Sequence, residues 1–210
     1  MDEPLLETAH PKAKKLLNED FYWSPIEETG PFGSDDGSDT FYGFSQWRST
    51  NKTKSPVTYL EKAMKGWGYP YFDWHEMDTT KIKEYISSKV PIDTSGVTSQ
   101  LPKLMENFKK MAEDAGKKFD EKEFMERMSA TSSNNMGANC ILGQDNAIIS
   151  VGFGQFVMEG KIDEDIQTLA ITAIKRQLLP ILISRWDNKY QQTRTEQLNK
   201  MLTVLGEMNK

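Results

Sequence analysis

The chain has 210 residues, 37 per cent of them hydrophobic and 27 per cent charged, which is the composition of a soluble globular protein. Its formal net charge of −5 provides no overall positive field for holding phosphates, so we expect no nucleic-acid partner. The single cysteine, Cys140, excludes an internal disulfide, and no apolar run approaches the ~20 residues of a membrane span, so we expect no membrane segment.

Length and the first residues predict one cytoplasmic domain. A chain of 210 residues corresponds to one domain or at most two. Residues 91–100 are a connection and the candidate seam between an acidic, aromatic N-terminal region and a helical C-terminal region. The start, Met1 to Pro4, has neither the basic residues nor the apolar run of a signal peptide, so the cytoplasm is the expected compartment.

Negative charge and aromatic side chains are concentrated in the N-terminal third. Between Lys15 and Arg48 there are seven acids and no Lys or Arg, so this stretch carries −7 and, given the net charge of −5, the rest of the chain carries +2. Residues 21–74 hold 14 of the 22 aromatic side chains. The acidity is therefore local, and it coincides with side chains that contribute strongly to protein interfaces.

Turn-forming residues dominate the first part of this acidic stretch. Repeated Gly, Pro, Ser and Asp residues predict that residues 18–39 are mostly loop. Asp39 is expected to cap a short helix that runs to about Ser49.

Two further helix starts follow. The Ser55-Pro56 pair, a capping hydroxyl before a proline, predicts a helix that ends near Gly66 or Gly68. Asp78 is expected to cap a third helix, which ends before the 91–100 connection.

The remainder of the chain has helical periodicity. Apolar residues recur at three-and-four spacing from Leu101 to Met111, and a helix capped near Asp120 follows them. Thr131–Asn139, rich in Ser, Asn and Gly, is expected to be a loop.

Asp145–Glu159 is apolar on nearly all sides, so periodicity does not separate a buried helix from a strand. Its length and the following Gly160 favour a helix, although Gly152 and Gly154 each cost about 1 kcal/mol there unless something packs closely against them.

The last two predicted helices complete the array. A helix begins at Asp163, and Pro180 should kink or divide it. A final helix spans about residues 190–208. The sequence therefore predicts an all-α, mainly helical fold, with an irregular aromatic-rich N-terminal region packed on a helical array.

The carboxylates of the 33–39 loop raise the hypothesis of a calcium site, because oxygen ligands on a glycine turn suit a hard cation. The EF-hand spacing is absent, since position three after Asp35 is Gly37 and position twelve is Gln46. Another kind of cation site stays open for Asp35 and Asp36, while Asp39 is expected to be a cap.

Other chemistry-bearing residues have simpler explanations. Glu27 and Glu28 would suit acid–base work if they shared an apolar pocket, but loop carboxylates are more often exposed or bonded to backbone amides. Cys140 is expected to be a small buried residue. His75 has Asp73, Glu76 and Asp78 beside it, yet no second histidine at metal-ligand spacing.

Two motifs suggest nucleotide binding, and both lack a necessary part. The aromatic run Gly66–Trp74 resembles a base-stacking platform, but its neighbours are acidic, so an aromatic core or a protein-binding surface is favoured. Gly152-Phe153-Gly154 lacks the third glycine of a dinucleotide loop.

The run from Phe21 to Asp39, continuing through Gly43-Phe44 and Gln46-Trp47-Arg48, resembles the N-terminal signature of the uncharacterised bacterial YfeS-like proteins. Gly152–Phe156 and Gln177–Pro180 are compatible with the same group. Gly30-Pro31-Phe32 followed by Asp35-Asp36 is similar to a motif of small bacterial proteins encoded near toxin and immunity genes. The resemblance implies a bacterial cytoplasmic protein and transfers no activity or catalytic residue.

These patterns favour a non-enzymatic binding protein, an immunity-type protein or regulatory inhibitor, with an acidic aromatic surface for a basic protein partner. The residues expected to form that surface are Trp23, Glu27, Glu28, Asp35, Asp36, Asp39 and Trp47. No cofactor and no metal are expected.

Two alternatives remain. One is an enzyme or metal-binding protein that uses the carboxylates of the 27–39 loop. The other is a purely structural role, in which Trp23 and Trp47 are buried and the acids cap turns and helices.

Overall fold

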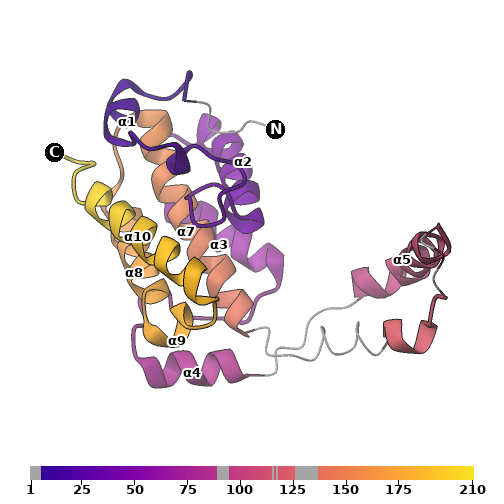
Figure 1. Cartoon of the computed structure of the whole chain (residues 1–210). Helices are drawn as coiled ribbons and strands as arrows, with labels where there is room; N and C mark the ends of the chain where they lie inside the picture. Colours follow the sequence, from indigo (N-terminus) through magenta and orange to yellow (C-terminus); the bar gives the residue numbers. More distant parts are fainter. Residues whose placement is uncertain (1–5, 89–94, 115, 117, 126–136) are drawn as a thin grey trace.

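The computed structural model describes residues 6–88, 95–114, 116, 118–125 and 137–210. All the secondary-structure elements in these residues are helices (Figure 1). The protein is all-α. The helices are α1 (Pro11–Leu16), α2 (Asp35–Thr50), α3 (Pro56–Trp67), α4 (Thr79–Ser87), α5 (Ser95–Asp114), α7 (Gly137–Glu159), α8 (Glu164–Gln177), α9 (Pro180–Ile183) and α10 (Asn188–Leu205), with a 3-10 turn at Asp20–Tyr22.

Helix α7 is the centre of the fold. It packs chiefly against α2 and α8, and also against α1, α3 and α4, so nearly all of its side chains are buried (Figure 1). The expectation that Asp145–Glu159 is a helix is confirmed, and the helix begins earlier, at Gly137. A helix buried on all sides has no amphipathic stripe, which is why periodicity alone did not identify it.

Two glycines let neighbouring helices approach α7. An added Cβ at Gly154 would lie 2.6 Å from Cδ2 of Phe41 on α2, and one at Gly152 would lie 3.2 Å from Cβ of Ala170 on α8. The close packing that would justify glycine inside this helix is therefore present on both sides.

Helix α2 begins four residues before its predicted cap. Ser34 is the N-cap, and its hydroxyl accepts a hydrogen bond from Gly37 N at 3.1 Å. Asp39 is the fifth residue of the helix, so the prediction that it caps the helix was wrong. Ser34 is the better cap, because its hydroxyl bonds a free N–H of the first turn. Asp35 and Asp36 then lie in that turn, where a negative charge favours the positive end of the helix dipole.

The starts predicted for α3 and α4 are confirmed. Ser55 accepts from Val57 N at 3.1 Å, and Gly68 ends α3 in the left-handed conformation at φ 67°. Asp78 accepts from Thr80 N at 2.7 Å and caps α4.

The prediction of a connection at 91–100 was wrong for its second half. Residues 95–100 belong to α5, and residues 91–94 lie outside the described part of the chain. In the expected loop Thr131–Asn139, residues 137–139 are the first turn of α7, and residues 131–136 lie outside the described part. Residues 121–125 are helical, and Asp120 caps them by accepting from Glu123 N at 3.0 Å.

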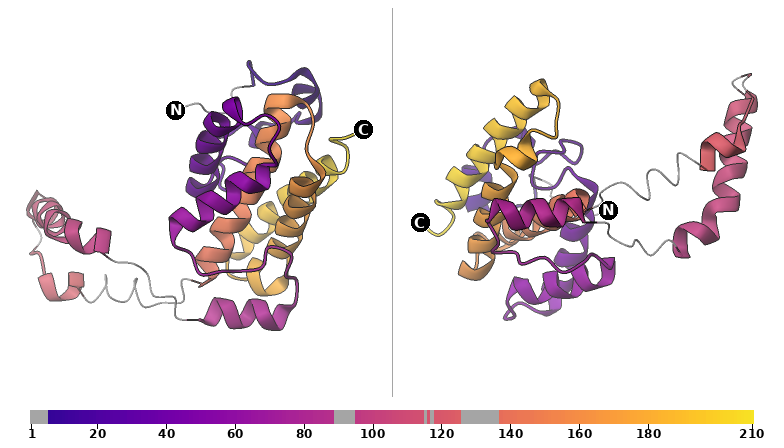
Figure 2. Two further views of the ribbon diagram at one scale, coloured as in Figure 1. Left: turned by 180° about the vertical axis from the view of Figure 1, so that it is seen from behind. Right: turned by 90° about the horizontal axis from the view of Figure 1, so that it is seen from below.

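Helix α5 stands apart from the other helices in all three views of the ribbon (Figures 1 and 2). The start of α7 lies against the end of α4, since an added Cβ at Gly137 would lie 2.1 Å from the carbonyl oxygen of Tyr85 in α4.

The prediction that Pro180 divides a helix is confirmed. Helix α8 ends at Gln177, and Pro180 is the first residue of α9. At the first position of a helix proline costs no hydrogen bond, because the N–H that it lacks would have no partner within the helix. Helix α10 then runs back along α8.

A buried ion pair fixes the loop between α3 and α4 to the bundle. The guanidinium of Arg176 on α8 forms a bidentate pair with Asp145 on α7, and both side chains are fully buried. The same guanidinium donates to the carbonyl oxygens of Trp74 at 2.9 Å and Glu76 at 3.0 Å. Burial raises the pKa of Asp145 to about 6 against the opposing effect of Arg176.

Candidate functional site: a groove between α3 and α8

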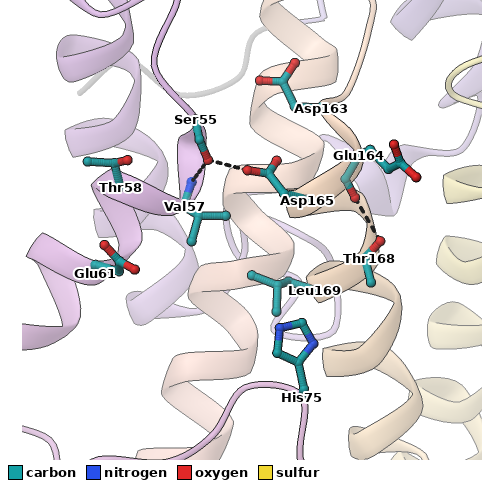
Figure 3. A pocket seen from close by; sticks show the side chains of 10 residues that line it. All are labelled: Ser55, Val57, Thr58, Glu61, His75, Asp163, Glu164, Asp165, Thr168 and Leu169. Atoms are coloured by element: carbon teal, nitrogen blue, oxygen red, sulfur yellow. Dashed lines mark hydrogen bonds between the residues drawn. The ribbon is translucent and has the colours of Figure 1, made fainter.

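A groove of about 870 Å³ lies between α3, the start of α8 and the loop that carries His75 (Figure 3). Its floor contains the apolar side chains of Val57 and Leu169. Helix α3 supplies one wall, and the first two turns of α8 supply the other. The remaining lining residues are polar, namely Ser55, Thr58, Glu61, His75, Asp163, Glu164, Asp165 and Thr168.

The groove is acidic. Four carboxylates line it, those of Glu61, Asp163, Glu164 and Asp165, and none of the described residues lining it is a Lys or Arg. Asp163 has a cation 3.6 Å away, the Arg48 guanidinium, and Asp165 accepts a hydrogen bond from Ser55. In the described part of the chain, Glu61 and Glu164 have no Lys or Arg within ion-pair distance, so their charges face solvent uncompensated.

Part of this acidity has a structural cause. Glu164 and Asp165 occupy the first turn of α8, where a negative charge favours the positive end of the helix dipole. Glu61 lies in the middle of α3 and has no such role. Glu61 on α3 and Asp165 on α8 place a carboxylate on each wall of the groove, whereas the side chain of Glu164 turns away from α3 (Figure 3).

Aromatic side chains continue the groove at its α4 end. A second hollow of about 520 Å³ shares Val57, Glu61, His75 and Leu169 with the first. It is lined in addition by Met64 and Lys65 of α3, by Gln144 of α7 and by residues of the 69–74 loop, namely Tyr69, Pro70, Tyr71, Phe72, Asp73 and Trp74. Among the described residues that line it, this hollow therefore contains one lysine, four residues after Glu61. Tyr71 is 88 % exposed, whereas Phe72 is buried in the core, so the loop alternates between surface and core.

The aromatic loop is held by the buried polar residues of α7 and α8. Trp74 Nε1 donates to Gln144 Oε1 at 3.0 Å, and Arg176 binds the Trp74 carbonyl from below. The guanidinium of Arg176 also lies over the Phe72 ring, 5.1 Å from its centroid. Helices α7 and α8 together therefore position the loop and, with it, the His75 side of the groove.

The three acids predicted at 35–39 lie on the first turns of α2. Asp35 and Asp39 are exposed, and Asp36 is half-buried. Burial raises the pKa of the Asp36 carboxyl, Asp35 and Asp39 add to this effect, and a hydrogen bond of 3.4 Å from Tyr69 opposes it. Since Tyr69 also lines the aromatic hollow, Asp36 lies behind one end of the groove.

The two predicted glutamates have different partners. Glu27 accepts from the Thr29 hydroxyl at 2.9 Å, while Glu28 accepts from the Tyr190 hydroxyl at 3.2 Å on α10. Arg194 lies close enough to Glu28 for their charges to interact. The two side chains therefore do not form the paired acid–base arrangement considered from the sequence.

The two predicted tryptophans lie in separate environments. Trp23 is half-buried and donates from Nε1 to the Leu17 carbonyl at 2.7 Å. Trp47 is half-buried between Phe44 and Tyr59, roughly 18 Å along the α2 axis from Asp35 at 1.5 Å per residue. The seven residues expected to form one surface thus lie in several places, and none of them lines the groove.

A third hollow, of about 160 Å³, lies beside the buried ion pair. Its lining includes Asp145, Gln177, Arg185 and Trp186. Arg176 already occupies both carboxylate oxygens of Asp145, and Gln177 already bonds Asn146 and Arg194. This hollow therefore offers a ligand few free polar groups.

The metal hypotheses gain no geometric support. Within the described ranges, no group of three or more His, Cys, Asp or Glu side chains has an arrangement that would hold a metal ion. Cys140 is 3 % exposed, which confirms the expectation of a small buried residue, and burial raises the pKa of its thiol. A neutral buried thiol is a poor nucleophile.

Comparisons with protein-family models, curated proteins and solved structures find no match to this chain. None of the described helices is both long enough and apolar enough to cross a membrane.

The sequence did not identify the groove. Asp163, Glu164 and Asp165 are three consecutive acids, but acids are typical of a helix start, so this run predicts the start of a helix and no groove. Their meeting with Glu61 joins residues about a hundred positions apart, which no local spacing reveals.

Proposed function

We propose that the protein is a non-enzymatic binding protein whose α3–α8 groove takes a basic segment of a protein partner. In this role it acts as an immunity-type protein or regulatory inhibitor of the bacterial cytoplasm. The observation that carries the proposal is the groove with four carboxylates, an apolar floor and no lysine or arginine among the described residues lining it.

The electrostatics of the groove favour a lysine- or arginine-rich segment. A cleft lined by one sign of charge concentrates the field that attracts opposite charges. Glu61 and Glu164 form no ion pair in the described part of the chain, so both carboxylates are available to a bound cation. The apolar floor at Val57 and Leu169 suits the aliphatic stem of the same lysine or arginine.

The aromatic end supports a protein partner rather than a small cation. Tyr71 is almost fully exposed and Trp74 is held rigidly by Gln144, so both offer contact area at small cost in conformational entropy. Tyrosine and arginine are both enriched where interface energy is concentrated, and a cation also binds over an aromatic face.

The acids of α2 extend the negative surface beyond the groove. Asp36 accepts a hydrogen bond from Tyr69 of the aromatic hollow. Burial raises the pKa of the Tyr59 phenol on α3, and the nearby charge of Asp39 raises it further. In this proposal they steer a basic partner toward the groove, a contribution to the association rate more than to affinity.

The test is a titration with a fluorescent oligolysine peptide followed by anisotropy at low and at physiological salt. The double variant Glu61→Gln/Glu164→Gln should weaken binding about tenfold at low salt, since each exposed ion pair contributes up to ~1 kcal/mol. It should also reduce the dependence of the dissociation constant on salt.

The matched control is Glu106→Gln/Glu113→Gln, which changes the net charge equally on exposed positions of α5. If the control weakens binding as much as the groove variant, attraction is a property of net charge alone and the proposal fails.

A further inference from the structure

The aromatic hollow adjoins one end of the groove. Val57, Glu61, His75 and Leu169 line both of them. Figure 3 shows Glu61 and His75 at the end of the groove that lies away from Asp163. A partner segment that follows the groove toward this end therefore passes Glu61 and reaches the hollow.

The hollow has the size and the lining of a binding pocket. Its volume of about 520 Å³ lies within the usual range of ligand sites, and it is ample for one long side chain. Most of the lining is apolar or aromatic, and the aromatic residues are Tyr69, Tyr71, Phe72 and Trp74.

Two of these rings are fixed by hydrogen bonds, and a third is free. Trp74 Nε1 donates to Gln144 Oε1 at 3.0 Å, and the Tyr69 hydroxyl donates to Asp36 at 3.4 Å. Tyr71 is 88 % exposed, and no ring of the described residues stacks on it. The hollow therefore offers preordered aromatic walls and one unoccupied aromatic face, so a ligand pays little to order it.

The charge of the hollow is negative in excess. Among the described residues that line it, Glu61 and Asp73 are carboxylates and Lys65 is a cation. Lys65 lies four residues after Glu61 on α3, yet the two side chains form no ion pair. Asp73 is exposed and accepts a hydrogen bond from His75 N at 2.9 Å through Oδ1. The ligand that complements both the charge and the rings is a cation with a flat face.

We propose that the aromatic hollow seats an arginine side chain of the basic partner segment, so that the site prefers arginine to lysine; this inference rests on the proposed function of the groove. A guanidinium is planar, stacks on aromatic faces and donates two parallel hydrogen bonds to a carboxylate. An ammonium is a compact, strongly hydrated point charge and has no such face. Tyr71 and Trp74 supply the aromatic faces, and Glu61 and Asp73 supply the carboxylates.

The same pairing of guanidinium and ring occurs twice inside the fold. Arg176 lies over the Phe72 ring, 5.1 Å from its centroid, and Arg194 lies over Trp186 at the same distance. Phe72 is buried, so its loop binds the protein's own arginine from the core side. An arginine that arrives from solvent meets the exposed neighbour, Tyr71.

The test is an anisotropy titration of the full chain with fluorescent hexaarginine and hexalysine, which have equal length and charge. We expect hexaarginine to bind about fivefold more tightly, the contribution of one exposed cation–aromatic contact. Tyr71→Ala should remove most of this difference and should lower the affinity for hexalysine much less. The matched control is Tyr42→Ala on α2, an exposed tyrosine that lines neither the groove nor the hollow, and it should leave both affinities unchanged.

Two charge variants establish the sign of the ligand. Asp73→Asn keeps the oxygen that accepts from His75 N and removes the charge, so it should weaken hexaarginine binding about threefold. Lys65→Gln removes the positive charge from the lining of the hollow and should strengthen hexaarginine binding. Weaker binding in Lys65→Gln would indicate a hollow built for an anion and would overturn the proposal.

The outcomes separate this inference from the proposed function. Hexalysine binding without any preference for arginine, or a preference that survives Tyr71→Ala, would overturn the arginine assignment and leave the acidic groove as the binding site. Failure of both peptides to bind would overturn the proposed function and, with it, this inference.

Discussion

The first turns of α2 and the groove between α3 and α8 are both acidic, yet only the second forms a concave site. Asp35, Asp36 and Asp39 lie together on a convex helix start, with Ser34 as the cap. The acids of α8 also lie at a helix start, but Glu61 on α3 supplies a carboxylate on the opposite wall of the groove, across from Asp165. Negative charge near a helix N-terminus is thus explained by the helix dipole alone. The acids of α8 become a candidate site only because a second helix, α3, forms the other wall of a groove with them.

The two regions also differ in what holds them. The α2 start depends on one capping hydroxyl and on the contact of α2 with α7. The aromatic end of the groove depends on Arg176, which joins α7, α8 and the 69–76 loop in a single buried cluster. A substitution in one region should therefore leave the other region undisturbed. We expect the loss of stability to be larger when the group removed is more deeply buried.

The largest effect is expected from Arg176→Leu. Removing the guanidinium leaves the Asp145 carboxyl fully buried without its partner, and it also releases the carbonyls of Trp74 and Glu76. Breaking a buried pair in this way costs about 3–5 kcal/mol, measured as the free energy of unfolding in urea.

Lys81→Leu is the control, because it breaks an exposed ion pair with Glu76 and should cost less than about 1 kcal/mol. Equal losses in the two variants would show that the buried cluster does not hold the loop.

Gly154→Ala should be the next most damaging change. The added methyl group would lie 2.6 Å from the Phe41 ring, so α2 must move away from α7. Overpacking of this kind costs about 1–3 kcal/mol. Gly66→Ala places the same group in open space on α3 and should stabilise the protein by up to about 1 kcal/mol. Thermal unfolding of the two variants measures both, and a neutral Gly154→Ala would contradict the close approach of α2 and α7.

Ser34→Ala tests which residue caps α2. Loss of the hydrogen bond to Gly37 should cost about 1 kcal/mol, whereas Asp39→Ala should cost much less, because Asp39 lies inside the helix. Urea unfolding of both variants measures the difference. A larger loss for Asp39→Ala would restore the cap that the sequence suggested.

The smallest effect concerns pH and the ion pair between Arg48 and Glu159. Burial raises the pKa of Glu159, but hydrogen bonds from Arg48 and Gln155 outweigh it, so the pKa lies below its ordinary value of 4.5. A lowered carboxyl pKa gives stability that is present above 4.5 and is lost as the pH falls through the folded-state value. The difference in unfolding free energy between the unaltered chain and Glu159→Gln should therefore shrink in acid. A difference that stays constant with pH would show that protonation of Glu159 is not coupled to unfolding.

The sequence predicted most helix starts and ends because local chemistry determines them. Ser55, Gly68, Asp78 and Pro180 act within one turn of their own position. The start of α2 was missed because Ser34 and Asp39 are both acceptable cap types. In the structure Ser34 caps the helix, and Ser150 of α7 donates a hydrogen bond to the Gly37 carbonyl in its first turn.

The groove was beyond sequence reasoning for a different reason. Its walls come from α3 and α8, and their separation depends on how both helices pack on α7. Trp23, Trp47 and Glu28 lie apart for the same reason. They are close in the sequence, but in the fold Trp23 bonds the Leu17 carbonyl, Trp47 packs on Tyr59 and Glu28 bonds Tyr190 of α10.

The most direct test of the account is a comparison of two variants with equal net charge in the oligolysine titration. One is Glu61→Gln/Glu164→Gln in the groove, and the other is Asp35→Asn/Asp39→Asn on the start of α2. The account predicts that the groove variant weakens equilibrium binding several-fold more, while the α2 variant mainly slows association. An equal or greater loss of affinity in the α2 variant would contradict the assignment of the α3–α8 groove as the binding site.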